Sequence, residues 1–215
     1  MRQAKESNKP MNSTECKRCG TCCKKGGPSF HIEDKALIED GFISVKFLYT
    51  IREGESVRDN ISDRIVYSPS DIIKIKGQKN GWTCFFYDET EKSCAVYEYR
   101  PLECKLLKCR DTRDIERIFG KNLLTRQDII STVEGLWELI IEHDQRCSYK
   151  KIRKLIDESG ETKKVDLSGK VAELIEYDKI IRELVVKKGE LDFELLDFLF
   201  GRPLSVTMNH FAETF

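Results

Sequence analysis

The chain has 215 residues, 40% of them hydrophobic and 34% charged, and its 37 basic and 37 acidic side chains give a formal net charge of zero. This composition can build a sizeable core and excludes a disordered chain, while the balanced charge provides no global field to attract nucleic acid or an anionic membrane. Residues 1–10 lack the apolar stretch of a secretory signal, and no segment reaches the ~18 apolar residues that span a bilayer, so we expect a cytoplasmic protein with no nucleic-acid or membrane partner.

The N-terminal part combines a polar tail with a dense group of thiols. Residues 1–13 are polar, and we expect a flexible tail. Residues 16–23 follow the pattern C-x2-C-G-x-C-C, which places four cysteines within eight positions. Residues 24–28, KKGGP, are typical of a loop. An apolar period over Ile32–Glu39, followed by Gly41, predicts a short helix that ends at a glycine C-cap.

Short strands are predicted in the middle of the chain. The apolar runs Ile65–Tyr67 and Ile72–Ile75 are separated by Ser-Pro-Ser, which is typical of a turn, whereas residues 48–54 have no clear period. Residues 82–87 and 93–97 flank a polar stretch and predict a β-hairpin with one cysteine, Cys84 or Cys94, on each arm.

Helical signals begin after this hairpin. Pro101 near the first helical position predicts a short helix that carries Cys104 and ends near Cys109. Residues 125–128, TRQD, resemble an N-terminal capping signal, and the residues after them recur on one helical stripe. The apolar members of this stripe are Ile129, Val133, Leu136, Trp137 and Ile140.

The same period continues toward the C-terminus. Extending it puts Cys147 on the apolar stripe, so that this thiol faces the rest of the protein. Further helices are predicted at about residues 148–157, 168–187 and 191–199, the last of them closed by Gly201 and Pro203.

These elements predict an α+β fold built around a metal. We expect a small, irregular, cysteine-rich module with short strands over residues 14–150, and a helical C-terminal extension over residues 151–215 that packs on it. One compact unit is favoured over two.

Nine cysteines in such a chain are best explained as metal ligands. A reducing compartment keeps thiols free, and both the odd count and the adjacent pair in residues 16–23 disfavour a disulfide framework. Thiolate is the soft donor that zinc and iron–sulfur clusters select. The candidate metal ligands are Cys16, Cys19, Cys22, Cys23, Cys84, Cys94, Cys104, Cys109 and Cys147.

The spacing of the cysteines leaves the metal open. Cysteines at every third position can present three thiolates to one point, as ferredoxin-like clusters require, but Gly26 stands where the bacterial ferredoxin run has its fourth cysteine. Ligands must then come from the downstream cysteines. Zinc remains an alternative although the knuckle spacing is atypical for a zinc ribbon. Eight thiols suit two four-ligand centres, one cluster plus a zinc, or a single cluster with spectators.

Several other side chains are candidates for parts of a site. Glu134, Glu138 and Glu142 repeat at helical spacing, and a solvated face explains them best. His143 is the first histidine candidate for a ligand or proton donor and His31 the second, although a satisfied surface histidine is the simpler interpretation of His143.

Basic and aromatic residues surround both cysteine groups. The basic residues could compensate a tetrathiolate, or be plain surface charges. They are Lys17, Arg18, Lys24, Lys25, Arg100, Lys105, Lys108 and Arg110. The aromatic residues are predicted to shield the centre from water rather than to stack on bases. They are Phe85, Phe86, Tyr87, Tyr97 and Tyr99.

Three segments together resemble one known family. The first is residues 16–23, the second is residues 82–87 (WTCFFY), and the third is residues 94–104, with the pattern C-x2-Y-x2-R-P-x2-C. They resemble the YkgJ-type cysteine-cluster family (CxxCxxCC), whose members are described as zinc- or iron-chelating. The resemblance covers roughly residues 14–150.

This resemblance implies a metal centre without implying an activity. A flagellin lysine methylase that shares the motif is understood to carry a [4Fe-4S] cluster, which favours iron–sulfur over zinc. Beyond Gly26-Gly27 the chain has no glycine-rich loop for a nucleotide or methyl donor, so its residues do not support methyl transfer.

Three functions therefore remain as hypotheses, and whether the chain is an enzyme stays open. The first is a cytoplasmic iron–sulfur or zinc protein for electron transfer, metal handling or structure, with a protein or redox partner. The second is an iron–sulfur enzyme that modifies a protein or small molecule at an open iron. The third is a zinc-stabilised interaction scaffold. An enzyme should leave one iron without a cysteine ligand, whereas a carrier or structural centre should be fully ligated.

Overall fold

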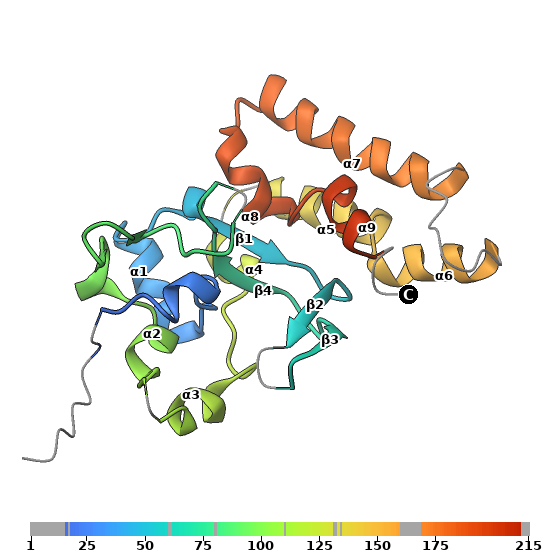
Figure 1. The fold of residues 1–215 in the computed structure, drawn as a ribbon. Coiled ribbons are helices and arrows are strands. Elements are labelled where there is room, and N and C mark those ends of the chain that lie inside the picture. Colours follow the sequence, from blue (N-terminus) through green and yellow to red (C-terminus); the bar gives the residue numbers. More distant parts are fainter. Residues whose placement is uncertain are drawn as a thin grey trace, which may run out of the picture.

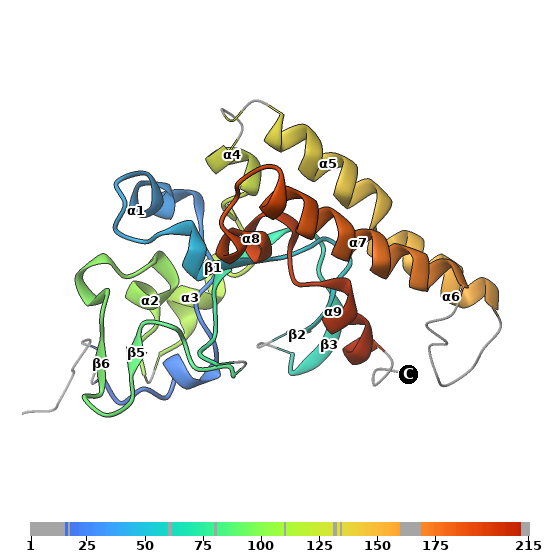
Figure 2. The same cartoon turned by 90° about the horizontal axis from the view of Figure 1, so that it is seen from above.

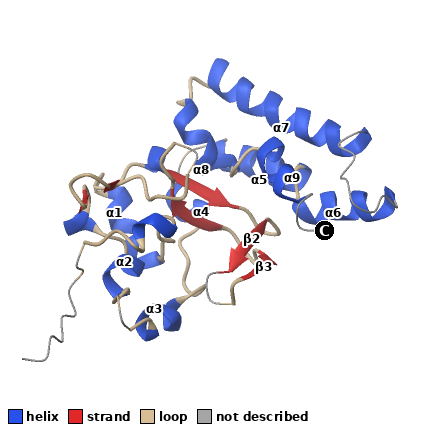
Figure 3. Ribbon diagram, in the orientation of Figure 1, coloured by secondary structure: helices blue, strands red, loops and turns tan. Residues whose placement is uncertain are grey.

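The predicted α+β fold is confirmed (Figure 3). The computed structural model describes residues 16, 18–59, 62–79, 81–109, 111–130, 133, 135–159 and 169–211. The tail predicted over residues 1–13 lies outside these ranges. Within them, no helix combines the length and the apolar character needed to cross a membrane. The strands β1 (Leu48–Ile51) and β4 (Ile72–Ile75) lie at the centre of Figure 1, between the N-terminal helices and the longer C-terminal helices.

The N-terminal helices are short. A 3-10 turn, η1, covers Cys23–Lys25, and a second, η2, covers Ile32–Asp34 and leads directly into α1 at Lys35–Glu39. This confirms the predicted helix, and Gly41 follows it with a φ of 77°, a conformation that glycine adopts at little cost.

The strands form three antiparallel pairs. β1 (Leu48–Ile51) pairs with β4 (Ile72–Ile75), and β2 (Ser56–Asp59) pairs with β3 (Arg64–Tyr67). The strands predicted over Ile65–Tyr67 and Ile72–Ile75 are thus present as β3 and β4, and each pairs with a strand that was not predicted. β1 showed no period in the sequence because three of its four residues are buried, so the polar alternation of a half-exposed strand is missing.

The third pair is shorter than the predicted hairpin. Its strands are β5 (Tyr87–Asp88) and β6 (Ser93–Cys94). Cys94 lies on one arm as predicted, but Cys84 precedes β5 in a loop, where it forms an isolated bridge with Gly77. The side-chain amide of Gln78 also holds this loop, because it donates to the carbonyl of Cys84 at 3.1 Å and to that of Tyr87 at 2.5 Å.

Two further 3-10 turns and two helices complete the first half. The turns are η3 (Val45–Phe47) and η4 (Tyr97–Tyr99). The predicted helix after Pro101 is α2 (Leu102–Leu106); Pro101 is its N-cap, and the helix ends before Cys109. α3 follows at Arg113–Ile118.

The long helix predicted after residue 125 is two helices. α4 covers Arg126–Ile130 and α5 covers Leu136–Arg146, and Gly135 at the start of α5 has a left-handed φ of 76°. The capping signal is confirmed, since the Thr125 amide donates to Asp128 Oδ2 at 2.8 Å. Since a left-handed residue cannot continue an α-helix, the stripe from Ile129 to Ile140 does not belong to one helix.

The C-terminal helices agree with the prediction to within a few residues. They are α6 (Tyr149–Ser159), α7 (Gly169–Lys187), the 3-10 turn η5 (Phe193–Leu195) and α8 (Leu196–Phe200). A further helix, α9 (Leu204–Phe211), was not predicted, because Pro203 marked an end in the sequence and here precedes a new helix. The predicted boundary at residue 150 falls in the first turn of α6 and stays a prediction.

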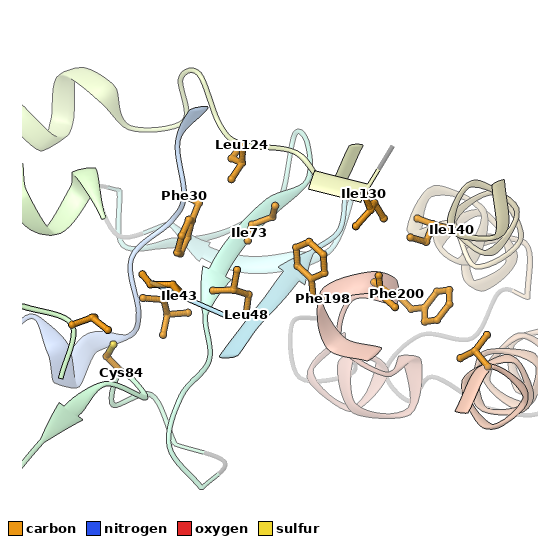
Figure 4. Packing of buried hydrophobic residues seen from close by; sticks show 14 of the residues in the cluster. Phe30, Ile43, Leu48, Ile73, Cys84, Leu124, Ile130, Ile140, Phe198 and Phe200 are labelled. Atoms are coloured by element: carbon orange, nitrogen blue, oxygen red, sulfur yellow. The ribbon is translucent and has the colours of Figure 1, made fainter. Parts of the chain in front are cut away.

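One hydrophobic core joins the two halves of the sequence. Its buried side chains come from the cysteine-rich half, for example Phe30 and Ile73, and from α5 and α8, for example Ile140 and Phe198 (Figure 4). The Thr50 hydroxyl of β1 also donates to the Phe198 carbonyl of α8 at 2.7 Å. A second buried cluster lies among α6, α7 and α9. Seen from above, the segments that carry β5, β6 and α2 gather at one end of the molecule, and α6 lies at the other (Figure 2).

Candidate metal centre

Backbone hydrogen bonds join the two cysteine-bearing segments. The Cys84 amide donates to the Cys23 carbonyl at 2.7 Å, and the Phe85 amide donates to the Lys76 carbonyl at 2.9 Å. The loop of residues 16–23 therefore lies against the loop that precedes β5, although more than 60 residues separate them in the sequence.

A glycine fixes how closely this first loop approaches the hairpin. Gly20 has a φ of 77°, and a Cβ added there would lie 2.1 Å from the Tyr87 hydroxyl oxygen. Tyr87 is buried and pairs with Cys94 across β5 and β6. Only a residue without a side chain allows this contact, so Gly20 and Tyr87 together bring Cys22 close to Cys94.

A second contact between the first cysteine loop and the segment of Cys94 involves Tyr97. Arg18 of the first loop lies 4.3 Å from the centre of the Tyr97 ring, and Arg100 lies 3.7 Å from it. Arg100 Nε also donates to the Tyr97 carbonyl at 2.7 Å. The two guanidinium groups thus hold one ring and tie the segment of Cys94 to the segment of Cys16.

Four thiols form a group in which every pair interacts electrostatically. Cys84 interacts with Cys22 and Cys94; Cys104 interacts with all three; and Cys94 also interacts with Cys22. Each of these interactions raises a thiol pKa, because two nearby thiolates repel each other. We call Cys22, Cys84, Cys94 and Cys104 the thiol quartet.

Burial adds to this repulsion. It is the largest cause that raises the pKa of Cys84, to about 11, and it raises the pKa values of Cys94 and Cys104 as well. Cys22 behaves differently, because its hydrogen bond with Cys23, at 4.0 Å between sulfurs, lowers its pKa to about 6 and raises that of Cys23. In the quartet Cys84 is buried, Cys94 and Cys104 are half-buried, and Cys22 is exposed. Thiols that resist ionisation are a donor set that a cation would stabilise strongly as thiolates.

The other cysteines of the module surround this quartet. Cys16 is half-buried and interacts with the Cys94 thiol. Cys19 is exposed; its Sγ lies 3.3 Å from Thr21 Oγ1, and this hydrogen bond lowers its pKa. Cys109 is exposed and follows α2.

A lysine that was not among the predicted basic residues lies beside the quartet. Lys74 of β4 interacts electrostatically with Glu103 and with the ionised forms of Cys84 and Cys104, and these interactions oppose the burial that lowers its pKa. Its Nζ donates to Ser29 Oγ at 3.2 Å, and the Ser29 amide donates to Glu103 Oε2 at 2.7 Å. A bound tetrathiolate would carry net negative charge, which this cation could offset.

The predicted basic residues have varied roles. Arg18 and Arg100 hold Tyr97, whereas Lys24 pairs with Glu89 and Lys108 with Asp114 at the surface. Lys17 and Arg110 lie outside the described residues. No sequence pattern indicated Lys74, because its strand brings it to the thiols through the fold.

The predicted aromatic shield is only partly formed. Tyr87 is buried and Phe86 packs against the core, but Phe85 and Tyr99 are 43% and 44% exposed. Phe85 stacks on Phe47 with ring centres 4.5 Å apart, and Tyr99 stacks on Phe42 at 3.9 Å. The prediction was therefore wrong for these two rings, which pair at the surface instead.

His31 is buried beside the same region. Its Nδ1 lies 2.8 Å from the Lys121 carbonyl oxygen, and its Nε2 lies 3.5 Å from Glu103 Oε1. The Glu103 carboxylate beside Nε2 raises the His31 pKa against the effect of burial. His31 therefore supports the helix of Cys104 through Glu103.

Cys147 and His143 lie apart from the thiol quartet. Cys147 is fully buried, as predicted, but in the second cluster among Tyr149, Ile152 and Leu174. The interpretation of His143 as a surface residue is wrong: its side chain is fully buried, and its Nε2 lies 2.7 Å from Asp178 Oδ1. His143 follows Ile140 by three residues, so it shares the buried face of α5.

The glutamates of the same helix behave as predicted where they are described. Glu138 and Glu142 are exposed on α5, in agreement with a solvated face. Glu134 lies outside the described residues.

Comparison with known proteins identifies one family. A family model named CxxCxxCC and described as "Putative zinc- or iron-chelating domain" matches residues 15–122, half of the chain. That range contains the thiol quartet together with Cys16, Cys19, Cys23 and Cys109. Neither the curated proteins nor the solved structures contain a match.

Proposed function

Because the chain belongs to this zinc- or iron-chelating family, we propose that it is an iron–sulfur protein that holds a [4Fe-4S] cluster with the thiol quartet. The observation that carries the proposal is that all six pairs within the quartet interact. A cluster with four cysteine ligands requires four thiols around one centre.

The spacing of the thiols supports a cluster over a single zinc ion. Zinc bonded to four sulfurs at about 2.3 Å requires sulfurs about 3.8 Å apart. Among the described residues, which include all nine cysteines, no three thiols have their sulfur atoms all within 4.8 Å of one another. A thiol group that is wider than a zinc site suits the larger volume of a cluster.

The surroundings of the quartet suit a fully ligated centre. When bound, a cluster supplies one-electron transfer, and four cysteines leave no iron open to substrate. This supports an electron carrier over an enzyme with an open iron. Lys74 would offset the negative charge of thiolates at Cys84 and Cys104. Such a carrier needs a redox partner, and its free thiols suit the reducing cytoplasm.

Zinc is the second candidate, and one observation favours it. The Cys22 and Cys23 sulfurs are only 4.0 Å apart, close to the separation in a zinc site, and the lowered Cys22 pKa provides a thiolate at neutral pH. A zinc ion would use Cys22, Cys23 and two of the three other thiols of the quartet.

Purification without oxygen distinguishes a [4Fe-4S] cluster from a zinc ion. We expect a brown protein that contains about four iron and four sulfide per chain, with the stoichiometry that defines the cluster. Serine substitution of any member of the quartet, for example Cys104→Ser, should abolish the iron and the visible absorbance. The exposed Cys109 provides the matched control, and Cys109→Ser should keep both.

Two results would overturn the proposal. One is a colourless protein with stoichiometric zinc and no sulfide after reconstitution with iron and sulfide. The other is full retention of iron in Cys104→Ser and Cys84→Ser, which would place the ligands elsewhere among the cysteines.

A further inference from the structure

We propose a second metal site, separate from the thiol quartet, in which His143, Cys147 and Asp178 bind zinc. Among the described residues, these three form the one group of possible ligands whose donor atoms all lie within 4.8 Å of one another. They provide a nitrogen, a sulfur and an oxygen, and zinc accepts all three donors.

The helices α5 and α7 bring these three donors close together. His143 and Cys147 are four residues apart at the end of α5, where the Cys147 amide donates to the His143 carbonyl at 2.8 Å. Side chains at this spacing share one face of a helix, as in other helical zinc sites. Asp178 comes from α7, and its Oδ1 lies 2.7 Å from His143 Nε2.

The site is closed to solvent and not fully satisfied. The side chains of His143, Cys147 and Asp178 are 0%, 0% and 2% exposed. His143 Nδ1 has no hydrogen-bond partner, and Asp144 Oδ1, 3.6 Å from it, also lacks one. The two atoms face each other, so Asp144 lies where the carboxylate partner of a metal-bound imidazole is usually found, on the ring nitrogen that does not bind the metal.

The surrounding groups orient the donors. Arg182 Nε donates to Asp178 Oδ1 and the Leu204 amide donates to Asp178 Oδ2, each at 2.9 Å. Asp144 pairs with Arg126 and lies 3.6 Å from Arg52 Nη1. Partners of this kind hold metal-binding carboxylates and imidazoles in position.

The charged side chains around the three donors balance one another. The carboxylates of Asp71, Asp144 and Asp178 are balanced by the guanidinium groups of Arg52, Arg126 and Arg182. Zinc bound by a neutral imidazole, a thiolate and the Asp178 carboxylate would therefore add a single positive charge to a neutral network.

Such a zinc would fasten α5 to α7. Neither helix carries a member of the thiol quartet, so the site acts on a part of the fold that the cluster does not reach. The three donors His143, Cys147 and Asp178 all come from this chain.

The test measures zinc, iron and sulfide together in the full chain. After reconstitution with zinc, the wild type should hold about one zinc per chain more than His143→Gln and Cys147→Ala, whatever zinc the other cysteines bind. Tyr149→Phe is the matched control, since Tyr149 is buried in the same cluster and its hydroxyl bonds Glu55 and Thr207 rather than the three donors. It should keep the zinc.

Thermal unfolding separates binding from a plain loss of stability. Zinc added to metal-depleted protein should raise Tm more in the wild type and in Tyr149→Phe than in either ligand variant, because the cysteines of the first half can bind zinc in all four proteins. Equal zinc content in the wild type and both ligand variants, or an equal zinc-dependent rise in Tm in all four proteins, would show that the three residues form only an ion-pair network. Iron and sulfide contents report on the thiol quartet independently of the difference in zinc. The proposal for the quartet and the proposal for this second site can therefore be rejected separately.

Discussion

Gly20 illustrates how a single residue controls the metal centre. Its φ of 77° and the nearby Tyr87 hydroxyl leave no room for a Cβ. We expect Gly20→Ala to separate the first cysteine loop from β5 and to lower both iron content and Tm. Metal analysis and thermal unfolding measure the two effects.

Gly41 is a matched control at the same backbone angle. It also has a φ of 77°, but nothing lies within 4 Å of an added Cβ. Gly41→Ala should therefore cost only the strain of the left-handed conformation, about 1 kcal/mol, and keep the metal. If both variants lose iron equally, the contact with Tyr87 is not what positions the loop.

Lys74 provides a second prediction for a single residue. Lys74→Met keeps most of the side-chain volume and removes the cation beside Cys84 and Cys104. Because a reduced cluster carries more negative charge than an oxidised one, we expect a more negative reduction potential, measured by an anaerobic redox titration. Lys76 pairs with Asp197 instead, and Lys76→Met should leave the potential nearly unchanged. A shift of equal size in both variants would argue against a specific effect of Lys74.

At the scale of the element, α8 connects the strands to the C-terminal helices. Phe198 is 1% exposed, and its carbonyl accepts the hydrogen bond from Thr50 of β1. Phe198→Ala should lower the free energy of unfolding by about 3–5 kcal/mol, as measured by denaturant titration, because it leaves a cavity in the shared core. Phe193, 71% exposed in η5, is the control, and Phe193→Ala should cost little.

Local patterns predicted most elements but not their partners. The helices near residues 32–39 and 169–187 and the strand of residues 72–75 have clear periods or caps, and they were found. β1 was missed because it is buried, and the division between α4 and α5 was missed because Gly135 interrupts an apolar stripe that continues on both sides. Partners of strands depend on contacts distant in sequence, which no local period encodes.

The same limit applies to the site. The cysteines could be named from their spacing, but the quartet depends on how β5, α2 and the first loop meet. Lys74 and Tyr87 became part of the site only through these contacts. His143 was misplaced because a polar residue on a buried face looks like a surface residue until its partner, Asp178 on another helix, is known.

For the whole molecule, removal of the metal should loosen one end and spare the other. The segments around the quartet, residues 18–30 and 81–109, are mostly loops and short turns, and repulsion and burial both oppose free thiolates there. We expect hydrogen exchange to rise in these segments after removal of the metal, while β1, β4 and α8 stay protected by the shared core. Unchanged exchange after verified metal loss would show that the module folds without its ligand.

The shared core also sets an order of events during synthesis of the protein. The thiol quartet is complete only after Cys104 has been made, and the strands beside it pack on α8, which is made almost 100 residues later than Cys104. We therefore expect the early cysteines to lack the support of the shared core until α8 has been made, and their thiols to need protection from oxidation until then.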